Sequence, residues 1–169
     1  MMNLKRLLIP MVMAGVFGVS AANAQDTTCA YTVASLQGSY AVLVNYGASV
    51  AIGLQTEVLD GKGNLTRTGV LNQPTVGSTT GARTIGTVTS TGTYTVNCNG
   101  TGTITRVVTK PDGTTAQAVD DFVITEAVKV VGRLAVAMTI VDSQRDPSVI
   151  LPGGVFVTRV HTRLPDPSF

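Results

Sequence analysis

Residues 92–103 read Gly-Thr-Tyr-Thr-Val-Asn-Cys-Asn-Gly-Thr-Gly-Thr, and this stretch predicts a β-hairpin. Tyr94 and Val96 alternate with polar residues before the turn, which is the period of a strand with one covered face. The segment 97–100 then supplies Asn and Gly residues that tolerate positive φ in a tight turn. We therefore expect strands at 84–97 and 101–110, joined by this turn.

The same two-residue alternation recurs along most of the chain. Thr and Val, both β-branched and suited to strands, make up about a third of the residues after position 24. Turn signals at 60–64 and 111–113 separate the apolar runs, and no segment has a sustained helical period. The further strands are expected at 39–46, 48–58, 65–72, 116–126, 129–141 and 154–163.

Eight sequential strands predict an all-β domain, a mostly antiparallel up-and-down barrel, because closure removes exposed sheet edges. An open two-sheet sandwich is the alternative.

In 39–46 the shared face holds Tyr40, Val42, Val44 and Tyr46. In 48–58, Val50, Ile52, Leu54 and Val58 alternate with Ser49, Gly53, Gln55 and Glu57. In 129–141, Leu134, Val136, Met138 and Ile140 oppose Arg133, Ala135, Ala137 and Thr139.

The first 24 residues have the order of a secretory signal peptide. Lys5 and Arg6 precede the apolar run Leu7 to Val19, and Ala22-Asn23-Ala24 forms a small-x-small cleavage site. The run is 13 residues long, short of the roughly 20 that a spanning helix needs. We expect a signal peptide at 1–24, an arm at 25–35, the barrel at 36–164 and a tail at 165–169, with the protein exported to the periplasm or beyond.

Charge and cysteine content reduce the number of functions to be expected of this protein. Without Lys5 and Arg6, the 10 remaining basic residues balance the 10 acidic residues, so no basic footprint for nucleic acid or a membrane surface is expected. Cys29 and Cys98 would reach an oxidising compartment, which favours a disulfide. A metal site would need further ligands at close spacing, so no metal or other cofactor is expected.

A terminal phenylalanine, here Phe169, is also typical of exported transmembrane barrels. Such barrels carry girdles of aromatic residues at both membrane interfaces. The chain has four Tyr, four Phe and no Trp, and Pro165 and Pro167 interrupt the tail. These features argue against a membrane-spanning barrel.

Three motifs together resemble a group of small exported bacterial β-barrel proteins similar to lipocalins or allene oxide cyclases. They are Leu36-Gln37-Gly38-Ser39-Tyr40, Asp60-Gly61-Lys62-Gly63-Asn64 and the hairpin 92–103, and the resemblance covers roughly 29–163. It implies a barrel fold, a Cys29–Cys98 pairing and almost no specific activity. Lipocalins have Gly-x-Trp at the first strand, and here Tyr40 replaces the Trp. The resemblance implies that Arg159 or Arg163 packs across Tyr40.

Catalytic motifs are sparse. The one histidine, His161, shares a strand face with Arg159 and Arg163, and we expect this face to be a solvated basic stripe. No nucleophile elbow, HExxH motif or phosphate-binding Gly loop occurs in the sequence. The Asp60 turn lacks the ligand spacing of a calcium loop.

Asp120 and Arg106 are the strongest candidates for an interior polar pair. Alternation places Asp120 with Phe122 and Ile124, and places Arg106 with Ile104 and Val108. If both faces turn inward, Asp120 needs a partner such as Arg106, because an unpaired buried charge is costly. The alternative, which the sequence favours, puts both residues at the rim or on the outside.

Three functions are compatible with these patterns. The first is a noncatalytic barrel binding a small apolar ligand, with Arg106, Asp120, Tyr94 and Tyr40 as candidate binding residues. The second is a structural or protein-interaction domain with a filled barrel, favoured by bulky Tyr, Leu, Met and Ile on inward faces. The third is a cofactor-free cyclase or isomerase that acts by shape and positioning.

Overall fold

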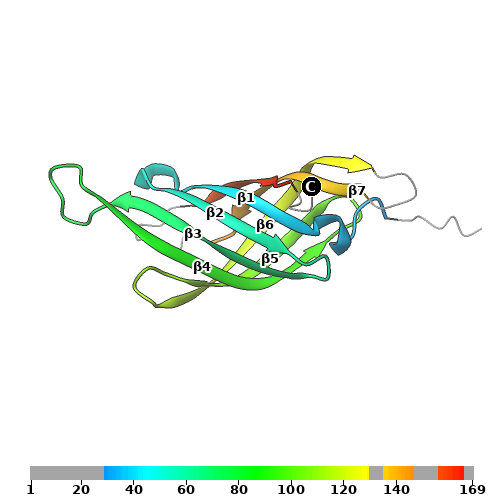
Figure 1. Ribbon diagram of the computed structural model, residues 1–169, viewed down its shortest axis with the longest axis horizontal. Coiled ribbons are helices and arrows are strands. Elements are labelled where there is room, and N and C mark those ends of the chain that lie inside the picture. The colour runs from blue at the N-terminus through cyan, green and yellow to red at the C-terminus, as the bar shows by residue number, and fades with distance from the viewer. Residues whose placement is uncertain (1–28, 130–134, 147–155, 166–169) are drawn as a thin grey trace, which may run out of the picture.

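The computed structural model describes residues 29–129, 135–146 and 156–165 and contains a closed antiparallel barrel (Figure 1). Its strands are β1 (Gly38–Asn45), β2 (Ile52–Leu59), β3 (Asn64–Pro74), β4 (Arg83–Val96), β5 (Thr101–Thr109), β6 (Thr115–Lys129), β7 (Ala135–Gln144) and β8 (Thr158–Arg163). Each strand pairs with its neighbours in sequence, and β1 closes the barrel against β8. The eight-stranded barrel is thus confirmed, and the open sandwich is excluded. The expected signal peptide lies outside the described residues.

The strands are strongly staggered around the barrel. A path from paired residue to paired residue that starts at Val96 goes once round and returns to β4 at Gly86, 10 residues away. This shear fits strands that tilt by about 35–45° from the barrel axis. An eight-stranded barrel of this kind has room for a layer of packed side chains or for one small ligand.

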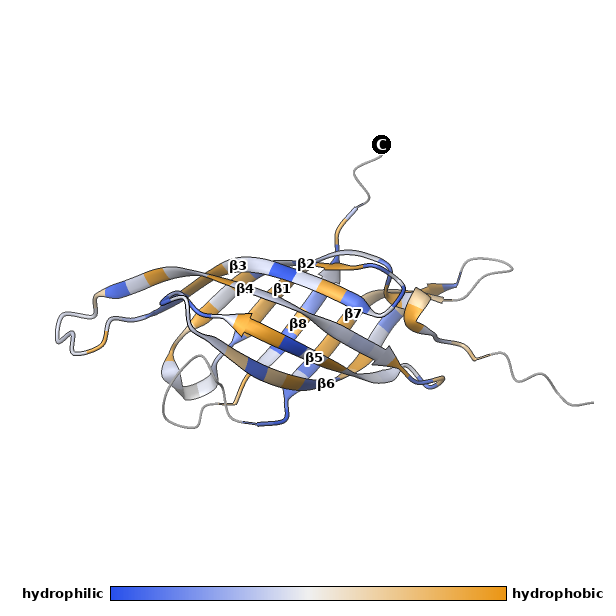
Figure 2. Ribbon diagram, turned by 90° about the horizontal axis from the view of Figure 1, so that it is seen from below, coloured by the Kyte–Doolittle hydropathy of each residue, from blue (hydrophilic) through white to orange (hydrophobic). Residues whose placement is uncertain are grey.

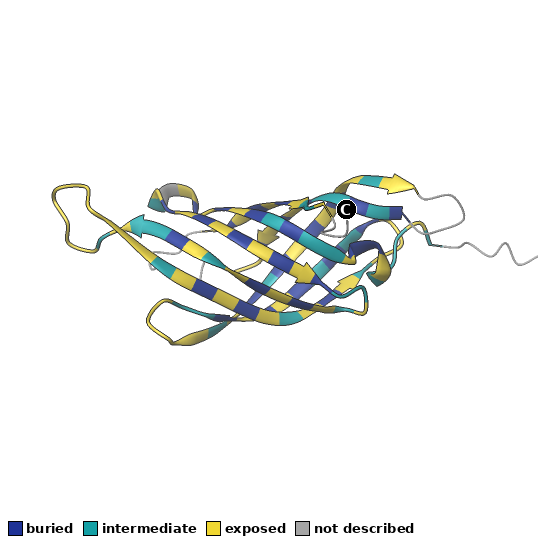
Figure 3. Ribbon diagram, viewed as in Figure 1, coloured by how far each residue is buried: buried dark blue, intermediate teal, exposed yellow. Residues whose placement is uncertain are grey.

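Buried and exposed residues alternate along the strands, as Figure 3 shows. Tyr40, Val42 and Val44 all face the interior, as the alternation in 39–46 predicts. On β2 the usual arrangement, with apolar residues inside and polar residues outside, is reversed. Leu54 and Val58 face outward, whereas Gln55 and Glu57 are buried.

The alternation on β7 changes phase within the strand. Ala135 and Ala137 are buried, and the next fully buried residue is Ile140. The change lies opposite an irregularity in the register of β6 between Ile124 and Ala127. An extra residue in a pair of strands shifts which side chains face inward, so the expectation that Ile140 shares a face with Val136 and Met138 was wrong. Leu134 and Arg133 lie outside the described residues.

The apolar interior is divided into two clusters. The arm-end cluster lies at the end where the N-terminal arm packs and holds Leu36, Tyr40, Leu59, Leu65, Tyr94, Ile104, Phe122, Ile124, Ala137 and Ile140. The far-end cluster holds Val42, Val44, Tyr46, Ala51, Leu71, Val88, Val108, Ala118 and Val157. The long β3–β4 hairpin projects from that opposite end in Figure 1. Polar residues occupy further inward positions of the barrel. Figure 2 shows hydrophilic and hydrophobic residues interspersed along the strands.

The strands can approach closely because glycines occupy several inward positions. A Cβ atom on Gly92 would lie 2.1 Å from the carbonyl oxygen of Thr105 and 2.8 Å from the Cβ of Arg106. Gly102 faces Phe122 in the same way, at 2.3 Å from its ring. The missing side chains therefore leave interior space for Arg106 and Phe122.

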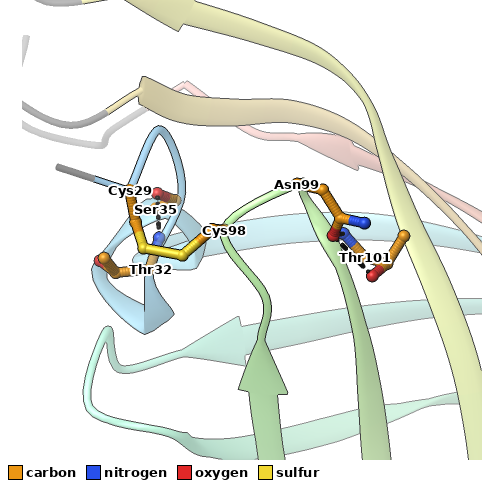
Figure 4. The surroundings of a disulfide bond; sticks show 6 residues. All are labelled: Cys29, Thr32, Ser35, Cys98, Asn99 and Thr101. Atoms are coloured by element: carbon orange, nitrogen blue, oxygen red, sulfur yellow. Dashed lines mark hydrogen bonds between the residues drawn. A yellow bond between two sulfur atoms is a disulfide. The ribbon is translucent and has the colours of Figure 1, made fainter. Parts of the chain in front are cut away.

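The N-terminal arm is attached to the central hairpin by the Cys29–Cys98 disulfide (Figure 4). The two Cα atoms are 4.6 Å apart. The arm then forms the short 3-10 helix η1 (Val33–Leu36), which places Leu36 in the arm-end cluster. A second 3-10 turn, η2 (Gly47–Ser49), joins β1 to β2. No helix in the described ranges is long and apolar enough to cross a membrane.

Replacing both cysteines by serine should lower the free energy of unfolding by about 4 kcal/mol, because the bond closes a loop of 69 residues. Chemical denaturation of the oxidised wild type and the Cys29→Ser/Cys98→Ser variant measures the difference. Identical denaturation midpoints would contradict a structural role for the bond.

Candidate functional site: a charged layer inside the barrel

Buried charged side chains form a layer inside the barrel. Its first part is an ion pair between neighbouring strands. Glu57 on β2 lies directly opposite Arg67 on β3, and both side chains are buried. Arg67 Nε donates to Glu57 Oε2 at 2.5 Å, and Arg67 Nη2 contacts the same oxygen. Burial would raise the pKa of Glu57, but the charges of Arg67 and His161 lower it to about 2. Glu57 is therefore a carboxylate.

The second part centres on Asp120, which two guanidinium groups share. Arg106 donates from Nε to Asp120 Oδ2 at 2.7 Å and from Nη2 to Oδ1 at 3.1 Å. Arg159 Nη1 donates to Asp120 Oδ1 at 2.9 Å and to Asp142 Oδ1 at the same distance. Asp120 and Asp142 are thus bridged by Arg159. Burial would lower the pKa of Arg159, but both carboxylates more than offset this effect and raise it.

His161 connects the two parts. Its Nε2 lies 2.8 Å from Asp142 Oδ2, and its Nδ1 lies 3.4 Å from Glu57 Oε1. Burial would lower the pKa of His161, but the hydrogen bond with Asp142 and the charges of both carboxylates outweigh burial and raise it. Burial likewise opposes ionisation of Asp142, yet Arg159 and His161 hold its pKa well below its usual range. The imidazolium form therefore fits this position.

The connected groups form one charged layer. In order of contact, its members are Arg67, Glu57, His161, Asp142, Arg159, Asp120 and Arg106. Three guanidinium groups and three carboxylates balance, and a protonated His161 leaves one positive charge. The pKa of Arg106 falls to about 10 because of burial and the nearby charges of Arg159 and Arg67. Burial also raises the pKa of Tyr46, which lies within the field of the same arginines.

The layer is closed to solvent on both sides by the apolar clusters. Its side chains are at most 3 % exposed. Tyr40, Val42 and Val44 next to it are 0 % exposed, so no water-sized space touches these side chains. One hollow, of about 360 Å³, lies beside η1 and is lined by residues that include Gln37 and Arg163. A substrate could not reach the described layer without opening the barrel.

The position of Asp120 and Arg106 corrects the favoured expectation. Both residues face the interior and pair with each other, so the rim placement was wrong. Their strand neighbours explain this, because Ile104 and Phe122 on the same faces belong to the arm-end cluster. A role of the pair in ligand binding stays a prediction.

Tyr40 and Tyr94 lie in the arm-end cluster rather than in the charged layer. The Tyr40 hydroxyl donates to the carbonyl oxygen of Ala137 at 2.9 Å. The Tyr94 hydroxyl donates to the carbonyl oxygen of Val33 at 3.1 Å and accepts from the amide of Gly61 at 2.9 Å. Tyr94 therefore connects the arm to the β2–β3 turn. The hydroxyl groups of both tyrosines are bonded to backbone groups, and a role in ligand binding stays a prediction for them too.

The expected solvated stripe on β8 was wrong. Arg159 and His161 are buried in the charged layer, whereas Arg163 lies at the end of the strand. The guanidinium of Arg163 is 5.9 Å from the centre of the Tyr40 ring and donates to the carbonyl oxygen of Gln37. The Arg–Tyr40 packing that the resemblance implies is therefore present, and Arg163 provides it.

Sequence reasoning did not single out Glu57, Arg67 or Asp142. Each is a charged residue in the middle of a strand, two positions from an apolar residue of the same face. Those neighbours are Leu59, Leu65 and Ile140. Within the described ranges, no group of three His, Cys, Asp or Glu residues could hold a metal ion.

Comparison with known proteins finds no matching family model, no matching curated protein and no matching solved structure. The chemistry of the charged layer and the shape of the barrel therefore carry the functional argument.

Replacing Asp120 by alanine should lower the free energy of unfolding by about 3–5 kcal/mol, because Arg106 is left buried without its carboxylate. Asp121 is the matched control. It faces outward on the same strand, and its ion pair with Arg145 is 54 % exposed, so Asp121→Ala should cost about 0–1 kcal/mol. Denaturation curves for the two variants test the contrast, and equal losses would refute the buried layer.

The charged layer also predicts how stability depends on pH. The stability due to His161 is complete below its ordinary pKa of 6.5 and declines as pH rises through the raised folded value. The contribution of Glu57, whose ordinary pKa is 4.5, declines as pH falls toward about 2. The free energy of unfolding should therefore be greatest between about pH 4.5 and 6.5.

Denaturation at a series of pH values measures this profile. In His161→Gln, the decline that the wild type shows above pH 6.5 should be much smaller. A wild-type profile that is flat above pH 6.5 would argue against a protonated His161.

Proposed function

We propose that this chain is an exported, noncatalytic barrel whose interior is a structural core and whose outer surface binds other macromolecules. The observation that carries the proposal is the filled interior. Two apolar clusters and the charged layer occupy the inward positions of the described strands, with side chains close to fully buried. Of the three functions considered from the sequence, this geometry favours the filled interaction domain.

The two rival functions need space that the described interior does not offer. A carrier of an apolar ligand needs a dry cavity lined by apolar groups. A cyclase needs a pocket in which a substrate is held in a reactive geometry. The centre of this barrel instead holds seven charged side chains in contact with one another, and these interactions would be broken by an inserted apolar molecule.

Export is part of the proposal and is supported by two independent features. The first 24 residues have the pattern of a signal peptide, and the Cys29–Cys98 disulfide suits an oxidising compartment. A closed barrel has no free strand edges, which suits a protein that must persist outside the cytoplasm without aggregating.

Titration of the purified oxidised protein with a fluorescent fatty acid tests the proposal. We expect no saturable one-to-one binding, because the interior is occupied. Val108→Trp, which adds bulk at an inward position of β5, is the control for interior binding. Saturable binding by the wild type that Val108→Trp abolishes would establish an interior ligand site and contradict a filled core.

A further inference from the structure

A hollow of about 360 Å³ opens at the arm end of the barrel. Its lining comes from four elements and consists of Ala34 in η1, Gln37 directly after it, Gly38 at the start of β1, Val136 on β7 and Arg163 at the end of β8. Ala34 and Gln37 are exposed and the other three residues are half-buried, so the hollow is open to solvent and lies outside the filled interior. Its volume is within the range of about 300–1,000 Å³ that is typical of small-molecule sites.

The guanidinium of Arg163 is held in position at the wall of this hollow. Its Nη1 donates to the carbonyl oxygen of Gln37 and lies 3.5 Å from the Tyr40 hydroxyl. The guanidinium also lies over the Tyr40 ring, 5.9 Å from its centre, and the Tyr40 hydroxyl is itself bonded to the carbonyl oxygen of Ala137. These contacts orient the cation before a ligand arrives, which lowers the entropic cost of binding.

Gly38 provides the space in which the guanidinium lies. A Cβ atom at this position would be 2.6–2.7 Å from the Nη1, Nη2 and Cζ atoms of Arg163. Gly38 also has a φ of +139°, a conformation that residues with a side chain rarely adopt. The start of β1 therefore lets the Arg163 side chain pass close to the backbone and reach the hollow.

The donors of Arg163 suit a carboxylate. A guanidinium has five N–H donors in a planar fork that matches the two oxygens of a carboxylate, so Arg163 can keep its bond to Gln37 and also donate to a ligand. Arg159 shows in this same protein that one guanidinium serves two acceptors, because it donates to both Asp120 and Asp142.

We propose that the hollow binds a small organic acid, whose carboxylate pairs with Arg163 and whose short carbon chain lies against Ala34 and Val136. The inference goes beyond the proposed function, because the site is separate from the filled core. The two apolar side chains favour an organic acid over inorganic phosphate, which has no apolar part. The volume suits a chain of a few carbon atoms, in contrast to the long chain of a fatty acid.

Titration of the purified, oxidised and 15N-labelled protein with 4-methylpentanoate, followed by nuclear magnetic resonance, tests the site. The amide signals of Ala34, Gln37, Gly38 and Val136 should shift saturably, with a dissociation constant of about 1 mM for a ligand of this size. 4-Methylpentanamide has the same carbon chain without the charge, and it should bind about 10-fold more weakly or not at all.

Three variants separate the charge from the shape of the site. Arg163→Gln should weaken binding by about 10-fold or more, because it removes the charged fork. Arg145→Gln is the matched control, since Arg145 is an exposed arginine that pairs with Asp121, and it should leave binding unchanged. Ala34→Trp keeps Arg163 but fills the hollow from an exposed position, and it should also weaken binding by about 10-fold or more.

Circular dichroism and thermal unfolding establish that the variants are folded. Equal affinity for 4-methylpentanoate and its amide, or for inorganic phosphate, would overturn the inference. Equal weakening by Arg163→Gln and Arg145→Gln would overturn it as well, as would unchanged binding by Ala34→Trp. Val108→Trp acts on the far-end cluster and should leave binding unchanged, so this result is independent of the fatty-acid titration that tests the filled core.

Discussion

The charged layer constrains the rest of this structure, because buried charges are tolerated only when each one contacts an opposite charge. Seven side chains from six strands meet this condition together, and Asp120, Asp142 and Glu57 each lie between two cationic groups. Loss of one member leaves its neighbours buried without a partner, which costs more than the pair contributes. The layer therefore fixes the register of the strands that supply it. A slip by one residue would turn every charged side chain to the outside.

The charged layer also shapes the outer surface. The short strands β1, β2 and β8 have few inward positions, and on β2 and β8 these include Gln55, Glu57, Arg159 and His161. Their outward positions are mostly apolar or threonine. The barrel thus has charge inside and few charged side chains on the outer face of these strands. The disulfide and Tyr94 hold the arm over one end of the barrel.

The barrel could be predicted from the sequence because alternation and turn residues mark each strand, and eight consecutive hairpin-connected strands can avoid exposed edges by closing. The inward face of each strand was harder to predict. Alternation shows that Arg159 and His161 share a face, but it does not show that this face is the inner one. Assigning charged faces to solvent failed on β5, β6 and β8, since the partners that make burial possible lie on other strands. The change of phase on β7 depends on a β6 irregularity that no local pattern marks.

The ionisation of His161 tests the charged layer most directly. The chain has one histidine, so its ring nitrogens can be followed without ambiguity by nuclear magnetic resonance in labelled protein. If His161 lies between Glu57 and Asp142, its midpoint should lie above 6.5, and both ring nitrogens should remain protonated below that midpoint. A midpoint at or below 6.5, with ring protons that exchange freely with water, would contradict the buried layer.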